Sequence, residues 1–510
     1  MSDSRVKKST YNMIAGFLNQ FLTLIFSFIS RTVFISVLGK EYLGLNGIFA
    51  DVLNLLSMAD LGFNTAMAYS FYKPLAEHDE GRLAALVYFY RKVYNVIAVI
   101  VTVAGIAVIP FLRLIVNTEK EIPNLELYYL FALAGIVISY LFVYKTTILT
   151  ADQKNYEVTK ITIWTNLFKT VSQIVVLLLT HNYILYLAIN VLFQFLNNLI
   201  ASRKATKSYP YITKSEMLSK EEQKGIFANM KSVFIYKVSG TLFNATTNIM
   251  ISVIVGTVAV GIYSNYQMVS QKLLLIIQII FSALTASIGN VIVKESAEKR
   301  YEVFMAAQSV SFILCGIITC IFGVLANDLV NVWLGEDFLL SVNVLTALTL
   351  NTYLSCVLLP LWVYRDATGL YRKTKYIMLI GSFLYIVLAI VGGNLWGITG
   401  IILSSAIARL STYFWYEPKL LFREYFERGP GKYYVSLLLN LLLVSATIVM
   451  LRYLLGEMAV DSWRSLIAKG IIVGVFCSFI FMTAYVKSPG FQIMWQKAKA
   501  ILKKKDENTK

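Results

Sequence analysis

The chain has 510 residues, of which 57% are hydrophobic and 15% are charged, and its formal net charge is +17. Soluble proteins carry about 25% charged residues, because polar side chains must cover their surface. A chain this apolar, with a mean hydropathy of +0.65, is excluded from that class and is expected to have lipid as its solvent.

Long uncharged runs predict membrane-spanning helices. Residues 95–112, 170–202 and 303–327 contain no charged side chain, and a helix needs about 20 apolar residues to cross a bilayer. The strict alternation that marks a membrane β-barrel is absent from the sequence. We therefore predict an all-α polytopic membrane protein with about 14 transmembrane helices. In chain order they are expected at 11–38, 42–72, 86–112, 125–150, 156–180, 183–202, 226–255, 259–293, 303–327, 339–364, 374–392, 397–418, 432–455 and 463–486.

The distribution of Lys and Arg predicts the orientation of these helices. If the N-terminus is placed inside, the inner segments carry 33 Lys and Arg residues and the outer connections carry 5. Positively charged residues concentrate on the cytoplasmic side of membrane proteins, so both termini are expected to be cytoplasmic. The net charge then reflects topology, and no nucleic-acid partner is expected.

Similar short motifs recur in chain order at offsets of 215 to 221 residues, which predicts an internal repeat. The repeat unit holds six helices, so both copies enter the membrane from the same side and are related by an axis along the membrane normal. The alternative is that short glycine turns recur between helices by chance. The matched motifs are Gly39 and Gly44 with Gly256 and Gly261, Lys73 with Lys294, and Thr159-Lys160 with Thr374-Lys375.

The repeat and the helix pattern together predict the domain organisation. A six-helix lobe is expected at 1–202 and a second at 226–421, joined by a cytoplasmic loop at 203–225. Two appended helices follow at 422–487. The basic tail 488–510 is expected in the cytoplasm, either as an amphipathic helix on the inner leaflet or as a simple stop-transfer segment.

The sequence gives little support to enzyme chemistry. Its only histidines are His78 and His181, its four cysteines lack the spacing of a metal site, and no phosphate-binding loop occurs. The longest loop has about 23 residues, which leaves no room for a soluble catalytic domain. We therefore expect a transporter without a metal or cofactor.

Charged residues near mid-depth of the predicted helices are candidate site residues. A charge at the bilayer centre costs at least about 2.5–3.5 kcal/mol, so such residues usually face a bundle interior or a hydrated cavity. The surplus of cations favours an anionic substrate. For each charged residue, the alternative to ligand binding is an ion pair that only orients two helices. Lys145 and Lys469 lie close enough to helix ends to reach the interface. Arg31 is expected in the outer third of the first helix and Asp60 in the inner third of the second. The residues expected near mid-depth are the cations Lys169, Lys237, Lys272 and Arg409 and the anion Asp51.

Uncharged polar residues on the second, seventh and eighth predicted helices support a hydrated cavity. The alternative is ordinary hydrogen bonding between helices. These residues are Asn64, Thr65, Asn244, Thr246, Thr247, Asn248, Asn265, Tyr266 and Gln267.

Several segments resemble the polysaccharide repeat-unit flippases of the multidrug/oligosaccharidyl-lipid/polysaccharide exporter superfamily. The first is Arg31 followed by Val37-Leu38-Gly39-Lys40-Glu41-Tyr42-Leu43-Gly44-Leu45. The others are Ala59-Asp60-Leu61-Gly62-Phe63 with Tyr72-Lys73-Pro74-Leu75-Ala76, and Val260-Gly261-Ile262-Tyr263-Ser264-Asn265-Tyr266.

This resemblance implies a fold, a substrate and a location. The two lobes would form a V around a central cationic cavity in the bacterial plasma (inner) membrane. An undecaprenyl-pyrophosphate-linked oligosaccharide would move from the inner to the outer leaflet by alternating access. Its other partners would be membrane lipids, a polysaccharide polymerase and glycosyltransferases.

The resemblance also implies roles for the candidate residues. Arg31 matches the first-helix arginine of the family's cavity. The chain departs from the family at Thr246-Thr247-Asn248, where many relatives carry an acidic residue. Substrate binding is expected from Arg31, Lys237, Lys272, Asn64, Asn248 and Tyr266, ion coupling from Asp51 or Asp60, and secondary cavity charge from Lys169 and Arg409.

Other functions remain open at this point. A multidrug exporter of the same superfamily would favour an acidic cavity, opposite to the charges counted here. A lipid II exporter would carry an arginine near the start of the eighth helix, where Tyr266 aligns. A membrane polysaccharide polymerase would need a larger outer loop, and a purely structural assembly partner would not be needed for flipping.

Overall fold

The computed structural model describes the backbone of residues 2–60, 63–119, 121–214, 216–493 and 495–496. All regular structure in this part of the chain is helical, with no strand, which confirms the predicted all-α fold class. Most of the expected basic tail lies outside the described residues, namely residues 494 and 497–510. Side chains are described for the same residues except 2–10, 59–60, 64–66, 228–233, 283, 286–287 and 371.

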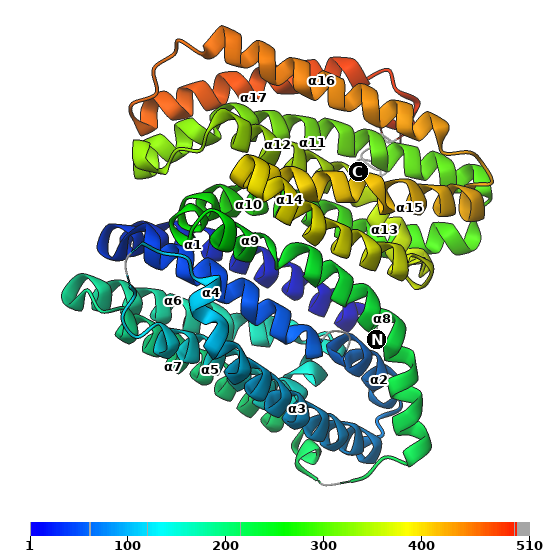
Figure 1. Ribbon diagram of the computed structural model, residues 1–510. Coiled ribbons are helices and arrows are strands. Elements are labelled where there is room, and N and C mark those ends of the chain that lie inside the picture. Colours follow the sequence, from blue (N-terminus) through cyan, green and yellow to red (C-terminus); the bar gives the residue numbers. More distant parts are fainter. Residues whose placement is uncertain (1, 61–62, 120, 215, 494, 497–510) are drawn as a thin grey trace, which may run out of the picture. The chain divides into compact units, whose positions relative to one another are not determined.

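Contacts along the chain divide it into two units, Met1–Gly261 and Ile262–Lys510. Helix α10, Thr257–Lys294, begins in the first unit and continues into the second. The other helices of the first unit are α1 (Ser2–Leu56), α2 (Phe63–Glu77), α3 (Glu80–Val108), α4 (Leu112–Ile115), α5 (Leu125–Ala151), α6 (Asn155–Thr180), α7 (Tyr183–Ser208), α8 (Lys220–Asn244) and α9 (Thr247–Ile254) (Figure 1). Those of the second are α11 (Ala297–Leu334), α12 (Val342–Val357), α13 (Leu359–Thr368), α14 (Tyr371–Ser411), α15 (Tyr413–Leu421), α16 (Gly431–Leu455) and α17 (Trp463–Tyr485).

The described residues contain ten helical segments that are long and apolar enough to cross a membrane. Two of them, Tyr11–Leu56 and Arg372–Phe426, have 46 and 55 residues, whereas one crossing needs about 20. Each contains a glycine with positive φ, Gly39 at 83° and Gly397 at 58°, and a helix bends at such a residue. The expected number of 14 spans stays a prediction.

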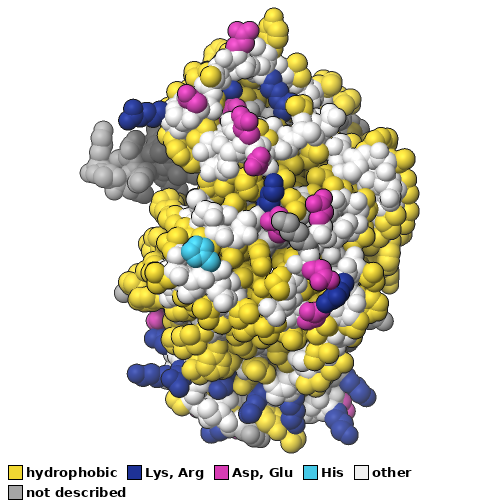
Figure 2. Space-filling view, turned by 60° about the vertical axis from the view of Figure 1, so that its left-hand side comes forward, with side chains coloured by type: hydrophobic (Ala, Val, Ile, Leu, Met, Phe, Trp, Pro, Cys, Tyr) yellow, Lys and Arg dark blue, Asp and Glu magenta, His cyan; other side chains and the backbone are white. Residues whose placement is uncertain are grey.

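The outward side chains of these helices are apolar, as lipid requires. Val99, Leu179 and Phe479 are among many large hydrophobic residues that are exposed. Hydrophobic side chains also cover much of the face that Figure 2 shows, with Lys and Arg gathered toward its lower edge. Exposed apolar surface on this scale fits a multi-pass membrane protein, because soluble proteins expose only small apolar patches.

Two predicted helices are interrupted in the structure. The helix expected at 42–72 ends at Leu56, and a short 3-10 turn at Ser57–Asp60 precedes α2. The helix expected at 226–255 is divided between α8 and α9 at Ala245 and Thr246. The hydrophobic pattern runs through both breaks, so periodicity alone did not reveal them.

The two glycine turns that the repeat paired pack against each other. A Cβ atom added to Gly44 would overlap the backbone carbonyl of Thr257, and one added to Gly261 would overlap the carbonyl of Lys40. The first glycines of the two turns also match, because Gly39 and Gly256 both have positive φ. Each turn thus contacts the other through the equivalent pair of positions, 40 with 261 and 44 with 257. The reciprocal contact supports the internal repeat.

The last two helices are part of the core of the second unit. Asn440 of α16 is fully buried, accepts a 2.8 Å hydrogen bond from the Tyr353 hydroxyl of α12 and donates one of 2.8 Å to the Tyr485 hydroxyl of α17. Phe481 of α17 lies directly over Gly316 of α11. Helices α16 and α17 are therefore fixed to α11 and α12 by buried contacts rather than only by their loops.

Candidate functional site

The predicted site residues are distributed over both units. The side chains of Asp60 and Asn64 lie outside the described residues. The first unit contains Arg31, Asp51, Lys169, Lys237 and Asn248, and the second contains Tyr266, Lys272 and Arg409.

The structure brings together Asp51 and Asn248. The buried carboxylate of Asp51 accepts a 3.0 Å hydrogen bond from the backbone N–H of Asn248. Asn248 is the second residue of α9, and the first N–H groups of a helix have no partner within it. Asp51 therefore stabilises the N-terminus of α9, where the helix dipole also favours a negative charge.

Arg31 lies beside α7. It is partly buried on α1, and its guanidinium is within electrostatic range of the Tyr186 phenol. The Tyr186 hydroxyl is also hydrogen-bonded to Ser30. The first-helix cation is therefore held next to an aromatic side chain of α7.

The three lysines predicted to face the cavity lie on different helices. Lys169, Lys237 and Lys272 are partly buried on α6, α8 and α10. Within the described part of the chain, neither Lys169 nor Lys272 has an ion-pair partner. An unpaired cation among apolar helices requires water or an anionic guest, so these two lysines remain candidates for ligand binding.

Tyr266 and Arg409 are engaged in contacts inside the second unit. The fully buried Tyr266 hydroxyl donates a 2.7 Å hydrogen bond to Asn327 and accepts one of 3.1 Å from the Leu340 N–H. Arg409 is 7% exposed and donates to the Ser355 hydroxyl at 2.9 Å. Both side chains connect helices of this unit.

The second unit also contains two ion pairs that join helices, and at least one side chain of each pair is buried. Arg365 of α13 contacts Glu417 of α15 at 3.0 Å, with side chains 7% and 2% exposed. Lys469 of α17 contacts Asp328 of α11 at 2.9 Å. The Asp328 side chain is 26% exposed, and the expectation that Lys469 reaches the membrane interface stays a prediction.

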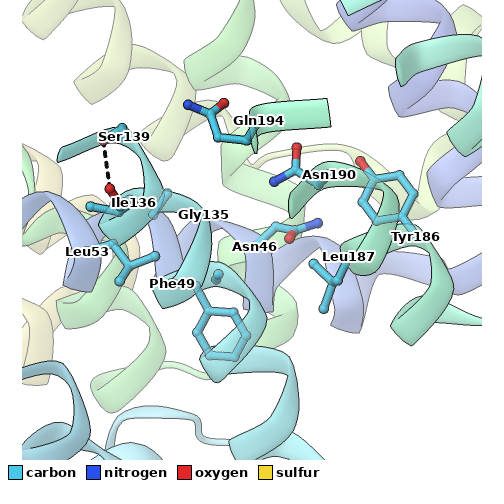
Figure 3. Close-up of a pocket in the computed structure, with 12 residues that line it drawn as sticks. Asn46, Phe49, Leu53, Gly135, Ile136, Ser139, Tyr186, Leu187, Asn190 and Gln194 are labelled. Carbon is cyan, nitrogen blue, oxygen red and sulfur yellow. Dashed lines mark hydrogen bonds between the residues drawn. The ribbon is translucent and has the colours of Figure 1, made fainter. Parts of the chain in front are cut away.

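A pocket of about 420 Å³ lies within the first unit between α1, α5 and α7 (Figure 3). Its polar lining consists of Asn46, Ser139, Tyr186, Asn190 and Gln194, and no charged side chain lines it. Apolar side chains complete the wall. The volume falls in the range of about 300–1,000 Å³ that is typical of small-molecule sites.

The polar groups of the pocket have unused hydrogen-bonding capacity. The amides of Asn190 and Gln194 make no hydrogen bond with any other described residue. Asn46 accepts a 2.7 Å hydrogen bond from the Tyr183 hydroxyl, which leaves its NH₂ group. Each amide carries two donors and one acceptor oxygen, so the pocket offers both kinds of group to a ligand.

Sequence reasoning missed this pocket, although a signal was present. Tyr186, Asn190 and Gln194 are spaced by four residues within an otherwise apolar run. Side chains four residues apart share one face of a helix. A polar stripe on a membrane-spanning helix indicates a buried hydrated site.

Similar solved structures place this architecture among membrane transporters. Lipid II flippase MurJ in its inward closed conformation is 16% identical, with a TM-score of 0.63, and the match covers 93% of this chain and 99% of that one. An inward-facing multidrug resistance MATE family transporter of the MOP superfamily is 15% identical, with a TM-score of 0.59 and coverage of 78% and 93%. A MOP superfamily transporter from Pyrococcus furiosus Vc1, described with a binding pocket of reverse polarity, is 12% identical, with a TM-score of 0.57 and coverage of 80% and 93%. The fold is therefore that of the MOP-superfamily transporters.

The family follows from the sequence itself. A family model described as polysaccharide biosynthesis protein matches residues 37–343, which is more than half of the chain. The chain therefore belongs to this family of polysaccharide biosynthesis proteins, and the resemblance inferred from its motifs is confirmed. No curated protein matches the sequence significantly.

Proposed function

We propose that this protein is a flippase that moves an undecaprenyl-pyrophosphate-linked polysaccharide repeat unit from the inner to the outer leaflet. The observation that carries the proposal is the match to a polysaccharide biosynthesis family in a chain with a transporter fold. Family membership supports a saccharide substrate, and the fold supports movement across a bilayer. The protein would lie in the bacterial plasma membrane with both termini cytoplasmic, in keeping with the Lys and Arg distribution.

The negative charge of the substrate opposes its movement through the membrane. A diphosphate cannot enter about 30 Å of hydrocarbon without compensation for its lost hydration. In the proposed mechanism, cations facing a central cavity replace that water through charge-assisted hydrogen bonds. Arg31 is the leading candidate, and Lys237 and Lys272 would assist it, with Lys169 and Arg409 as more distant positive charge. The polyprenyl chain would remain in lipid.

The membrane potential supplies a driving force in this scheme. Moving one elementary charge across 100 mV is worth about 2.3 kcal/mol. An anion that moves outward from a negative interior goes downhill in this field. Coupling to protons or sodium through Asp51 or Asp60 would add to this force.

Single substitutions of the candidate cations test the proposal. We expect Arg31→Ala, and to a smaller degree Lys237→Ala and Lys272→Ala, to reduce surface polysaccharide. A hydrogen bond to a charged group contributes about 1.5–3 kcal/mol, so the loss for Arg31→Ala should be about tenfold or more.

The matched control is Arg113→Ala, because the Arg113 side chain is 73% exposed and pairs with Glu126 near the ends of the candidate spans Glu80–Ile115 and Leu125–Ala151. Protein abundance in the membrane must be measured in parallel. Unchanged export by all three variants at normal abundance would contradict the cationic-cavity mechanism.

A further inference from the structure

We propose that the pocket between α1, α5 and α7 binds the first, uncharged sugar of the lipid-linked saccharide, beside the diphosphate held by Arg31. This inference rests on the proposed function, and it adds a second contact site for the same substrate. Every residue that lines the pocket belongs to the first unit. The site is therefore complete within Met1–Gly261.

The hydrogen-bonding groups of the pocket match those of a sugar. A sugar hydroxyl both donates and accepts, as do the amides of Asn46, Asn190 and Gln194. Asn190 and Gln194 are partly buried, so their amides remain open to the pocket. Asn190 and Gln194 have no partner among the described residues, so a ligand that supplies hydroxyl groups would satisfy them.

The pocket wall favours a neutral ring over a charged group. None of its lining residues carries a charge, and a charge buried there would lack a counter-ion. The rings of Phe49 and Tyr186 and the side chain of Leu187 provide apolar surface around the amides (Figure 3). Apolar walls with a few polar groups at fixed positions are the usual composition of a small-molecule site.

The position of Arg31 matches the covalent structure of the substrate. The first sugar is bonded directly to the diphosphate, so their two binding sites must be neighbours. Tyr186 lines the pocket and is also within electrostatic range of Arg31. Tyr186 therefore lies near Arg31 as well as in the pocket wall, which places the proposed sugar site close to the proposed phosphate site.

Gly135 of α5 gives a direct way to fill the pocket. It lines the cavity, and a Cβ atom added there would meet no atom within 4 Å. Gly135→Leu should therefore occupy the sugar site without disturbing helix packing. Gly474→Leu in α17 is the matched control, because a Cβ at Gly474 also meets no atom within 4 Å.

Binding to the purified full-length protein in lipid nanodiscs tests the inference. The probes are undecaprenol, undecaprenyl diphosphate, and undecaprenyl diphosphate bearing one glucose, galactose, N-acetylglucosamine or N-acetylgalactosamine. We expect at least one sugar-bearing probe to bind about tenfold more tightly than undecaprenyl diphosphate. Gly135→Leu, and Asn190→Ala combined with Gln194→Ala, should remove this gain and leave the affinity for undecaprenyl diphosphate unchanged, whereas Gly474→Leu should keep the gain.

The outcomes separate the two proposals. If the wild-type protein binds undecaprenyl diphosphate no more tightly than undecaprenol, the proposed function itself fails. If it prefers the diphosphate but gains nothing from any of the four sugars, the flippase proposal stands and the sugar site is refuted. A gain that survives both Gly135→Leu and the double substitution would also refute the sugar site.

Discussion

The buried carboxylate of Asp51 caps the N-terminus of α9. Its carboxylate accepts from the Asn248 N–H, which any side-chain oxygen in the same place could do. The structure thus distinguishes two roles for this residue, since helix capping needs an oxygen, whereas ion coupling needs a group that can carry charge.

Replacement of Asp51 separates these roles. We expect Asp51→Asn to accumulate and export polysaccharide normally, because its amide oxygen can still accept from the Asn248 N–H. Asp51→Ala should lower stability by about 1–3 kcal/mol, since it leaves a buried donor unsatisfied. Membrane abundance, thermal unfolding and surface polysaccharide are the measurements. Lost export by Asp51→Asn at normal abundance would instead assign its charge to ion coupling.

At the scale of elements, the pair of α13 and α15 depends on a buried ion pair. Removing one partner of a buried pair costs up to about 3–5 kcal/mol. The second carboxylate that contacts Arg365, Asp366 at 3.1 Å, is 55% exposed and compensates its charge only in part. We therefore expect Glu417→Ala to lower the midpoint of thermal unfolding strongly. Lys373→Ala serves as the control, because its pair with Glu424 is 2.7 Å long but the lysine side chain is 58% exposed, and exposed pairs contribute about 0–1 kcal/mol. Equal effects of the two substitutions would contradict the importance of the buried pair.

The sequence predicted elements best where an apolar run ends in polar turn residues. The helices expected at 125–150 and 432–455 are observed at Leu125–Ala151 and Gly431–Leu455. The sequence did not predict helix boundaries correctly where a tertiary contact determines the backbone conformation. Thr246-Thr247-Asn248 lies within the single helix expected at 226–255, but Asp51, 197 residues before Asn248 in the chain, caps a new helix at this point.

The pocket illustrates the same limit for the site. Arg31 and the other charges within the predicted helices could be recognised singly, because each is unusual in an apolar run. The pocket is formed by moderately polar residues on α1, α5 and α7, and each of them has an ordinary explanation by itself. Only the packing of the three helices brings Asn46, Ser139 and Asn190 to one cavity.

For the whole molecule, the contact between the two glycine turns should be sensitive to any added atom. We expect Gly44→Ala and Gly261→Ala each to lower stability by about 1–3 kcal/mol, because their new methyl groups would meet backbone carbonyls that cannot move independently. Gly240→Ala in α8 is the control, since a Cβ there meets no atom within 4 Å. Alanine is favoured over glycine within helices, so this control should be neutral or slightly more stable. Thermal unfolding in the same detergent compares the three.

The contact between the two turns is symmetric, because each turn uses the same two positions. A contact in which each side presents the same pair of positions to the other is isologous, the form that two identical subunits adopt about a two-fold axis. Lys40 with Gly261 and Gly44 with Thr257 reproduce that form within one polypeptide. In a homodimer one mutation changes both sides of such a contact, whereas here a substitution changes one turn and leaves its counterpart as it is. The two turns can therefore diverge while the contact persists, as the equivalent residues Lys40 and Thr257 already have.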